Sequence, residues 1–306
     1  MKKTLLATLI ISSFVSSAVS AATVYDKNET KLSVGGRAEV RALFSDAVDG
    51  SALDKSRARI NFAGETIISE GLTGFAFMEY EIKPGEVATN RYLFAGIGTQ
   101  AGDFSYGRQD TSSVQISDMT DIASYHSGQQ QYIDAASDKQ SNNFVFANNS
   151  IKGLSLKANY IANGDEDKTD AKPEDSFGLS ALYSMDFGLD LGASYSDQDQ
   201  ENQVALGAGY TFDNLYLAAT YAMGSVAEND DFTSLEVAAH YKFTKEFRMI
   251  AMYGVAEEDL AGDTEDYLAL EGQYRFNDNL RSYASYKVNN LNDGEDELVA
   301  GLRYNF

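Results

Sequence analysis

Strict alternation of side-chain character is the feature of this sequence that most limits how it can fold. In the C-terminal half, five successive segments carry an uncharged and mostly apolar residue at every second position. One of them places Val204, Leu206, Ala208, Tyr210 and Phe212 on one side, with small or polar residues between them. A period of two is that of a β-strand whose two faces meet different surroundings. The sequence therefore predicts an all-β fold.

Several of these segments end in the same pair of aromatic residues, two positions apart. The pairs recur every 30 to 33 residues and are Tyr210 with Phe212, Tyr241 with Phe243, Tyr274 with Phe276, and Tyr304 with Phe306. One such repeat has room for two strands, a short turn and a longer loop. Aromatic residues at one fixed end of alternate strands form the interfacial girdle of a membrane barrel. We therefore place the apolar faces outward, against lipid, rather than in the core of a soluble sandwich.

The connections alternate between short turns and longer acidic loops, which is the layout of bacterial outer-membrane barrels. Between them we count sixteen strands, an even number that puts both termini on one side. Sixteen strands enclose an aqueous channel rather than a packed core. The expected strands are 31–44, 56–68, 71–83, 88–100, 102–110, 139–150, 152–163, 175–185, 188–197, 202–212, 214–224, 232–243, 246–256, 266–276, 279–289 and 297–306.

The first 21 residues have the organisation of a secretory signal peptide. Lys2 and Lys3 precede an apolar stretch, and Val19-Ser20-Ala21 offers a cleavage site. We expect cleavage after Ala21, with Ala22 as the alternative, so that residues 22–306 form the barrel. No later apolar run reaches the 18 residues that a spanning helix needs.

Charge and composition exclude several classes of function. The chain has 24 Lys and Arg against 46 Asp and Glu, a net charge of −22, which becomes −24 without Lys2 and Lys3. Nucleic acid is therefore not an expected partner, because binding it needs a clustered positive surface. There is no Cys and there are only two His, and we predict neither a metal site nor a cofactor.

One long segment, Thr111 to Asp138, interrupts the alternation between the fifth and sixth expected strands. It spans about 28 residues and carries Asp118, Asp121 and His126. Loops of this length inside compact domains are usually functional or disordered. A loop folded into the lumen would narrow the pore and act as an electrostatic filter. We expect that arrangement here, with an ordinary surface loop as the alternative.

Several short motifs, read together, give the chain a family resemblance. They are Ala58-Arg59 followed by Phe62-Ala63-Gly64-Glu65-Thr66, then Gly71-Leu72-Thr73-Gly74, Arg91 with Phe94-Ala95-Gly96, Phe104-Ser105-Tyr106-Gly107-Arg108, Thr120-Asp121 and the terminal Phe306. Over its whole mature length the chain resembles the general diffusion porins of Gram-negative bacteria. The resemblance implies a homotrimer of 16-stranded antiparallel transmembrane β-barrels in the outer membrane, each with an inward-folded third loop.

The resemblance also implies roles for individual residues. Arg37, Arg59, Arg91 and Lys139 correspond to the basic side of the pore constriction, and Asp121 to an acidic residue of the loop. Tyr125 stands where the family has a second carboxylate, so Asp118 is the candidate to replace it. Arg108 corresponds to a residue at the subunit interface. Leu302, Tyr304 and Phe306 resemble the signal read by the barrel-assembly machinery, and outer-membrane lipid and lipopolysaccharide are expected surroundings.

These observations predict passive diffusion of ions and small hydrophilic solutes, with mild cation selectivity from the acidic loops. The nearest alternative is a channel specific for a sugar or for phosphate. A structural or adhesin barrel with a plugged lumen is a further alternative. Asp121, Ser124 and His126 could suggest a hydrolase, but they lie in one loop without a nucleophile-elbow pattern, and we do not predict an enzyme.

Overall fold

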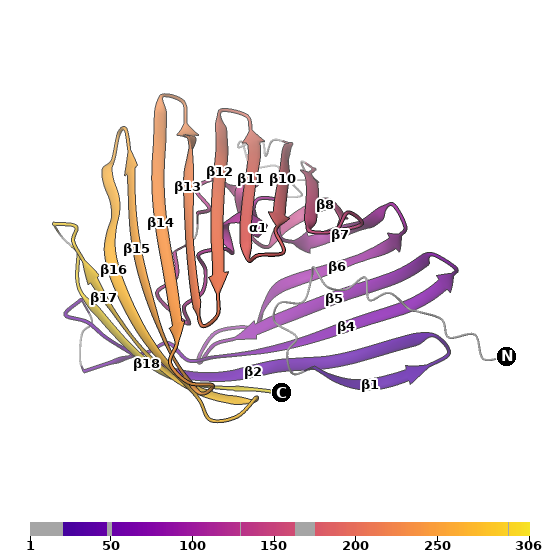
Figure 1. Ribbon diagram of the computed structural model, residues 1–306, viewed down its shortest axis with the longest axis horizontal. Helices are drawn as coiled ribbons and strands as arrows, with labels where there is room; N and C mark the ends of the chain where they lie inside the picture. Colours follow the sequence, from indigo (N-terminus) through magenta and orange to yellow (C-terminus); the bar gives the residue numbers. More distant parts are fainter. Residues whose placement is uncertain (1–20, 48–50, 129, 163–174, 293) are drawn as a thin grey trace.

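The protein is a closed antiparallel β-barrel in the computed structural model, which describes residues 21–47, 51–128, 130–162, 175–292 and 294–306 (Figure 1). The wall consists of sixteen strands, β2 and β4 to β18. They are β2 (Thr30–Phe44), β4 (Arg57–Ser69), β5 (Leu72–Ile82), β6 (Thr89–Thr99), β7 (Gly102–Gln109), β8 (Gln140–Asn148), β9 (Leu154–Ile161), β10 (Ser176–Ser184), β11 (Leu189–Gln198), β12 (Glu201–Phe212), β13 (Leu215–Ala227), β14 (Asp230–Lys242), β15 (Phe247–Glu258), β16 (Gly262–Arg275), β17 (Leu280–Asn289) and β18 (Glu297–Asn305).

Each wall strand pairs with its neighbours in sequence, and the last strand closes on the first. The closing pairs run from Leu298 opposite Phe44 to Asn305 opposite Arg37. This closure is required in lipid, because a free strand edge there would leave its backbone groups without hydrogen bonds. The predicted sixteen-stranded barrel is therefore confirmed. The signal peptide prediction falls almost wholly on residues 1–20, which lie outside the described residues.

Two further strands were not predicted. β3 (Leu53–Asp54) is a short pairing with β2, whereas β1 (Ala22–Lys27) forms a hairpin with the start of β2. Phe306 and Gly36 exchange backbone hydrogen bonds where β18 ends, and β1 continues along β2 from there. Asn28 and Glu29 both have positive φ, as a two-residue type I′ turn requires. The second turn position usually has Gly but here has Glu29, so the sequence does not indicate this turn.

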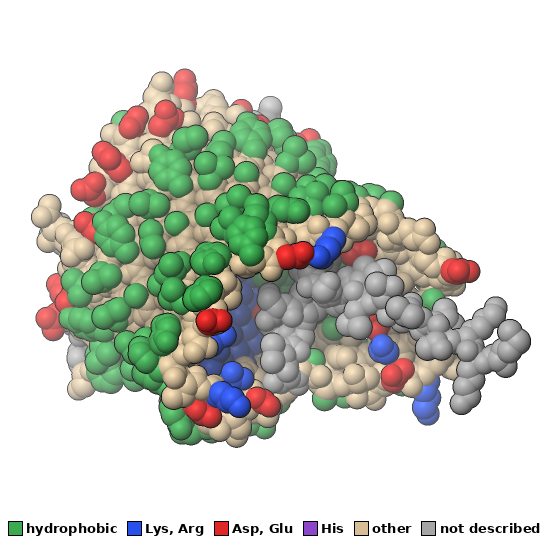
Figure 2. Space-filling model, in the orientation of Figure 1, with side chains coloured by type: hydrophobic (Ala, Val, Ile, Leu, Met, Phe, Trp, Pro, Cys, Tyr) green, Lys and Arg blue, Asp and Glu red, His purple; other side chains and the backbone are tan. Residues whose placement is uncertain are grey.

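The two faces of the wall differ as the alternation predicts. Large apolar side chains such as Leu206, Leu217 and Leu270 are exposed on the outer face, and Figure 2 shows hydrophobic side chains covering the wall. The aromatic pairs at the short-turn ends of alternate strands are also exposed, for example Tyr274 and Phe276, whose ring centroids lie 5.1 Å apart. The inner face carries buried polar residues. The interfacial girdle is thus present in the structure.

The only helices in the described ranges lie in the long connection between β7 and β8. They are α1 (Val114–Ser117) and the 3₁₀ turn η2 (Asp134–Ala136). Neither is long or apolar enough to cross a membrane. In Figure 1, α1 is seen beside β10, β11 and β12, strands that it also contacts.

The outward position of Leu206 gives the first prediction. It lies midway along β12 with 48% of its surface exposed. Leu206→Arg should lower the free energy of unfolding from lipid vesicles by about 2–4 kcal/mol, because it places a charge in hydrocarbon. Thr211→Arg on the inner face of the same strand should cost far less. Urea titration of both variants checks this, and equal losses would contradict the assignment of the two faces.

Candidate functional site

The 111–138 segment is held along the polar face of the barrel wall by side-chain hydrogen bonds to nine successive or nearly successive strands. The first half is fixed to β9 through β13. The Ser112 amide donates to Asn159 at 2.8 Å, and the hydroxyls of Thr120 and Thr220 lie 3.0 Å apart. Further wall partners of the segment include Ser155, Ser180, Ser196, Gln203, Tyr216, Ser234, Glu236, Glu271, Gln273, Ser285 and Glu297.

Apolar contacts fix the same part of the segment. Ile116 is fully buried and packs in a cluster with Ala205, Ala222 and Phe232. Ile122 and Ala123 pack against a second cluster that includes Ile250. Small residues on the wall leave the space for this contact, since a Cβ at Gly192 or Gly207 would collide with side chains of the segment. These close contacts therefore fix the segment in one position on the wall.

Two buried glutamates of the wall hold the middle of the segment. Glu236 accepts hydrogen bonds from the Thr120 hydroxyl at 3.2 Å and from the Gly128 amide at 3.0 Å. A side chain at position 128 has no room, because its Cβ would lie 2.4 Å from the Glu236 carboxyl group. Glu271 accepts from the Ser124 amide at 2.9 Å. These carboxylates are the anchors that the sequence analysis did not identify.

The last anchors lie at β17 and β18. The His126 ring joins the Ser285 hydroxyl (Nδ1, 2.8 Å) and the Glu297 carboxylate (Nε2, 2.9 Å). Tyr125, at the position where the resemblance implies a carboxylate, instead lies under the Arg41 guanidinium, 4.9 Å from ring centroid to Cζ. His126 therefore serves to attach the segment, and its neighbours Asp121 and Ser124 are not joined to it by any hydrogen bond among the described residues.

A network of six arginines and three glutamates faces the lumen from β2, β4, β5, β6 and β18, where the segment covers little of the wall. We call it the arginine wall; its members are Arg37, Arg41, Arg57, Arg59, Arg91, Arg303, Glu39, Glu79 and Glu81. The closest pairs join Arg59 Nε to Glu81 at 2.6 Å and Arg91 Nε to Glu79 at 2.9 Å. Charge-assisted contacts of this kind fix the direction of each guanidinium.

The structure thus brings together three of the four predicted basic residues, Arg37, Arg59 and Arg91. Arg91 reaches the lumen only through an irregularity in strand pairing. Glu79 pairs with Tyr92 and Tyr80 with Asn90, which leaves Arg91 without a partner residue. Simple alternation would have put Arg91 on the outer face with Leu93, whose side chain is exposed there. The bulge turns it inward, so family resemblance found what the period alone could not.

Lys139 lies at the end of the 111–138 segment, just before β8, with its ammonium group against the Asp138 carboxylate. Burial, and then repulsion by Arg91, lowers the pKa of the Lys139 ammonium group to about 8. Arg37, Arg59 and Arg91 thus lie in one network of ion pairs, whereas Lys139 pairs with Asp138 within the described residues.

Asp118 and Asp121 project from the segment with exposed side chains, and neither forms an ion pair among the described residues. Desolvation inside the barrel, followed by repulsion from Asp110 and Asp121, raises the pKa of the Asp118 carboxyl group. The exposure of that side chain to lumen water limits the size of this shift. In the described part of the chain, no group of His, Asp or Glu residues is arranged to hold a metal ion.

Two predicted sites lie on the outer face. Arg108 donates to the Ser141 hydroxyl at 3.0 Å and borders a shallow hollow of about 860 Å³, together with Leu32, Met78, Leu93 and Tyr106. At the end of β18, Leu302, Tyr304 and Phe306 are all exposed on the lipid side.

Comparison with known proteins identifies the family. The family model described as Gram-negative porin matches residues 6–294. The chain is a Gram-negative porin. The porin is 34% identical over the full length of both chains to outer membrane protein U of Vibrio parahaemolyticus. It superposes on OmpF of Salmonella typhi, solved in complex with daunomycin, with a TM-score of 0.82, 25% identity, and coverage of 93% of this chain and all of that one.

A more distant structure shares only the fold. OmpT of Vibrio cholerae, solved in a trimer form, gives a TM-score of 0.74 at 17% identity and covers 91% of this chain and all of that one. Family, relatives and fold agree that this porin is an outer-membrane diffusion channel, and they indicate a channel rather than an enzyme.

The His126 attachment predicts a pH dependence of stability. Desolvation lowers the pKa of the imidazole below its usual 6.5, against the raising effect of Glu297. The neutral ring therefore contributes stability above about pH 6.5, which is lost as the pH falls toward the folded pKa. His126→Gln keeps a hydrogen-bonding side chain that does not titrate. Between about pH 8 and about pH 5 the wild type should lose more unfolding free energy in urea than the variant; parallel losses would contradict this role.

Proposed function

We propose that the arginine wall and the 111–138 segment are the two sides of the channel constriction. The observation that carries this proposal is their complementary placement. The segment covers strands from β9 to β18, whereas Arg37, Arg59 and Arg91 come from β2, β4 and β6. Between them the lumen has fixed positive charge on one side and the carboxylates of Asp118 and Asp121 on the other.

Such an arrangement sorts solutes without a binding step. Opposite fixed charges produce a transverse field, which orders water and orients dipolar solutes as they pass. An apolar solute must disrupt that ordered water and therefore passes less readily, while ions and small hydrophilic molecules diffuse through. The field has a fixed direction because the guanidinium groups of Arg57, Arg59 and Arg91 are each held by a glutamate.

The sign of ion selectivity follows from charges beyond the constriction. The whole chain carries a net charge of −22, and its long loops are acidic. Negative charge at the loop end of the channel raises the local concentration of cations there. The carboxylates of Asp118 and Asp121 are unpaired within the described residues and add to this effect, whereas the charges of the arginine wall are partly neutralised. We therefore propose mild selectivity for cations.

Reversal potentials in planar bilayers test the constriction. Under a KCl gradient the wild type should conduct with a reversal potential that favours K⁺. The double variant Asp118→Asn, Asp121→Asn should move that potential toward Cl⁻, because it removes negative charge from the narrowest part of the lumen. Asp213→Asn, in an exposed turn, removes the same charge outside the lumen and should leave the potential unchanged.

Each possible contrary result of these bilayer recordings contradicts a different part of the proposal. An unchanged potential in the double variant would remove Asp118 and Asp121 from the constriction, and a wild-type preference for Cl⁻ would contradict the proposed sign. A folded wild-type protein without open currents would contradict the channel itself and support a structural or adhesin barrel.

We further propose that the outer face of β4, β5 and β6 is the contact surface of a homotrimer. Its centre is formed by the small residues Gly64, Ala76 and Ala95, which line the hollow that Arg108 borders. Small residues let transmembrane elements approach closely, and the atom nearest to a Cβ at Gly64 would be the Lys31 carbonyl oxygen, 4.0 Å away. The trimer form of the related Vibrio cholerae fold is consistent with this assembly.

Filling the hollow should prevent association. Ala95→Trp puts a bulky but lipid-compatible side chain into it, whereas Ala219→Trp makes the same change on the outer face of β13, away from the hollow. Native mass spectrometry should find trimers for the wild type and Ala219→Trp, and mostly monomers for Ala95→Trp. Trimers of Ala95→Trp would place the contact surface elsewhere.

Biogenesis completes the proposal. Residues 1–21 direct export and are removed. The exposed Leu302, Tyr304 and Phe306 at the end of β18 then present an outward-facing apolar strand end to the barrel-assembly machinery. The finished barrel sits among outer-membrane lipid and lipopolysaccharide, with its apolar face in the hydrocarbon.

A further inference from the structure

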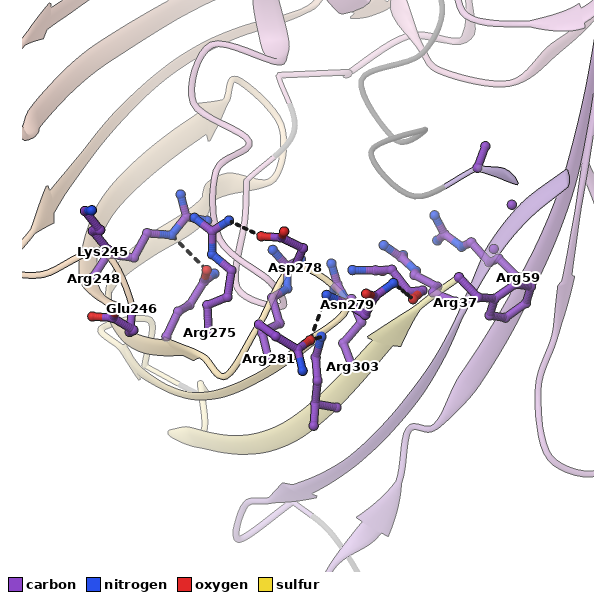
Figure 3. Close-up of a pocket in the computed structure, with 18 of the residues that line it drawn as sticks. Arg37, Arg59, Lys245, Glu246, Arg248, Arg275, Asp278, Asn279, Arg281 and Arg303 are labelled. Atoms are coloured by element: carbon purple, nitrogen blue, oxygen red, sulfur yellow. Dashed lines mark hydrogen bonds and ion pairs between the residues drawn. The ribbon is translucent and has the colours of Figure 1, made fainter. Parts of the chain in front are cut away.

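A cavity of about 420 Å³ opens inside the barrel at the end where the short turns lie. Eight basic and three acidic side chains line it, as do the turns at residues 244–246 and 277–279. Figure 3 shows Arg248, Arg275, Arg281, Arg303 and Arg37 along the wall of this cavity. Short turns face the periplasm in bacterial barrels. The cavity is therefore the periplasmic vestibule, and Arg37, Arg59 and Glu79 of the arginine wall line its inner end, next to the proposed constriction.

The register of the sheet forces these arginines together. Arg275 is directly opposite Arg281, Arg281 opposite Arg303, Arg303 opposite Glu39, and Glu39 opposite Arg57. This single row across five strands contains four arginines and one glutamate. Directly opposed residues on one face have Cβ atoms about 5 Å apart, and like charges in such pairs are destabilising. A second like pair, Arg37 opposite Arg59, adjoins the row.

The available carboxylates do not neutralise this row. Glu39 is already shared, with Arg303 Nε at 2.7 Å and Arg57 Nε at 2.8 Å, and Arg37 Nε lies farther away at 3.8 Å. The Nε atoms of Arg37 and Arg281 are buried without a hydrogen-bond partner. Leaving a buried polar group unsatisfied is unfavourable, so both nitrogens are suited to donate to an anion that enters the cavity.

Two other features of the cavity favour the binding of an anion. Arg248 donates to the neutral amide oxygen of Gln273 at 2.8 Å instead of to a carboxylate. Asp278 reaches only Arg275, at 3.6 Å. Of the remaining acids in the lining, Glu79 is bound by Arg91, and Glu246 receives the hydroxyl hydrogen bond of Thr244 in the turn. Arg281 therefore has no acidic partner within the described residues.

We infer that this cavity is a binding site for multiply charged oxyanions, of which inorganic phosphate is the simplest, with Arg281, Arg37 and Arg248 as its principal ligands. Guanidinium groups match phosphate oxygens in pairs of parallel hydrogen bonds, which a chloride ion cannot use. The inference rests on the proposed channel, because the solute enters through its lumen. It adds a retention site for polyvalent anions to a pore that otherwise favours small cations.

Block of single-channel current by inorganic phosphate tests the site. Channels are first recorded in KCl, which shows that each variant is folded and open. Phosphate is then added on one side at constant ionic strength. In the wild type it should cause brief interruptions of current, at lower concentration from the short-turn side than from the loop side. Arg281→Gln should weaken the block roughly tenfold to a hundredfold, the effect of losing charged hydrogen bonds.

Lys152→Gln is the matched control. It removes one positive charge at the same end of the barrel, but Lys152 is exposed, pairs with Asp186 at 2.8 Å and is not part of the cavity. Its phosphate block should equal that of the wild type. Normal KCl currents without any phosphate block would overturn the site while leaving the channel intact. Equal block in wild type and Arg281→Gln, or equal weakening in Lys152→Gln, would also overturn it, since general attraction by the basic end would then suffice.

Discussion

The hydrogen-bonded closure of β18 on β2 is the constraint on which the rest of the structure depends. In lipid every backbone amide and carbonyl must be paired within the protein, so the sheet has to close and its outer face has to be apolar. Because closure satisfies the backbone and the outer face meets the lipid, the side chains of the inner face need not be apolar. This face can carry buried glutamates, arginines and hydroxyls at densities that a soluble core would not tolerate, and all of the candidate functional chemistry of this porin lies there.

The inner face is divided into two regions that depend on each other. The wall from β9 to β18 uses its polar side chains, above all Glu236 and Glu271, to bind the 111–138 segment. The wall from β2 to β6 uses its polar side chains to bind one another, through Glu39, Glu79 and Glu81. Each region fixes one side of the lumen. The excess of arginine over glutamate in the second region then continues through Arg303 and Arg281 into the vestibule, where Arg281 has no ion pair with a carboxylate among the described residues.

Much of this could be predicted from the sequence, because the period of two reports which face lies against lipid. It located all sixteen wall strands, and it agrees with the inward position of Arg59, whereas Arg37 was named from the family resemblance. The period fails where the backbone departs from regular pairing. Arg91 turns inward at a bulge, and β1 follows an Asn-Glu turn that lacks the expected glycine. The sequence also did not predict which wall residues bind the 111–138 segment. The contacts of His126 with Ser285 and of Gly128 with Glu236 join residues more than 100 positions apart, and no local pattern encodes such pairs.

The central claim, that the anchored segment sets the width of the channel, is tested most directly by the size limit for neutral solutes. Proteoliposome swelling would be measured with a series of uncharged sugars of increasing size, for the wild type and for Glu236→Ala, Glu271→Ala. The double variant removes the two carboxylate anchors and adds no bulk. The account predicts unchanged rates for the smallest sugar and altered rates for the largest ones, because the released segment no longer holds a fixed opening. Identical rates across the whole series, in a double variant shown to be folded, would contradict it.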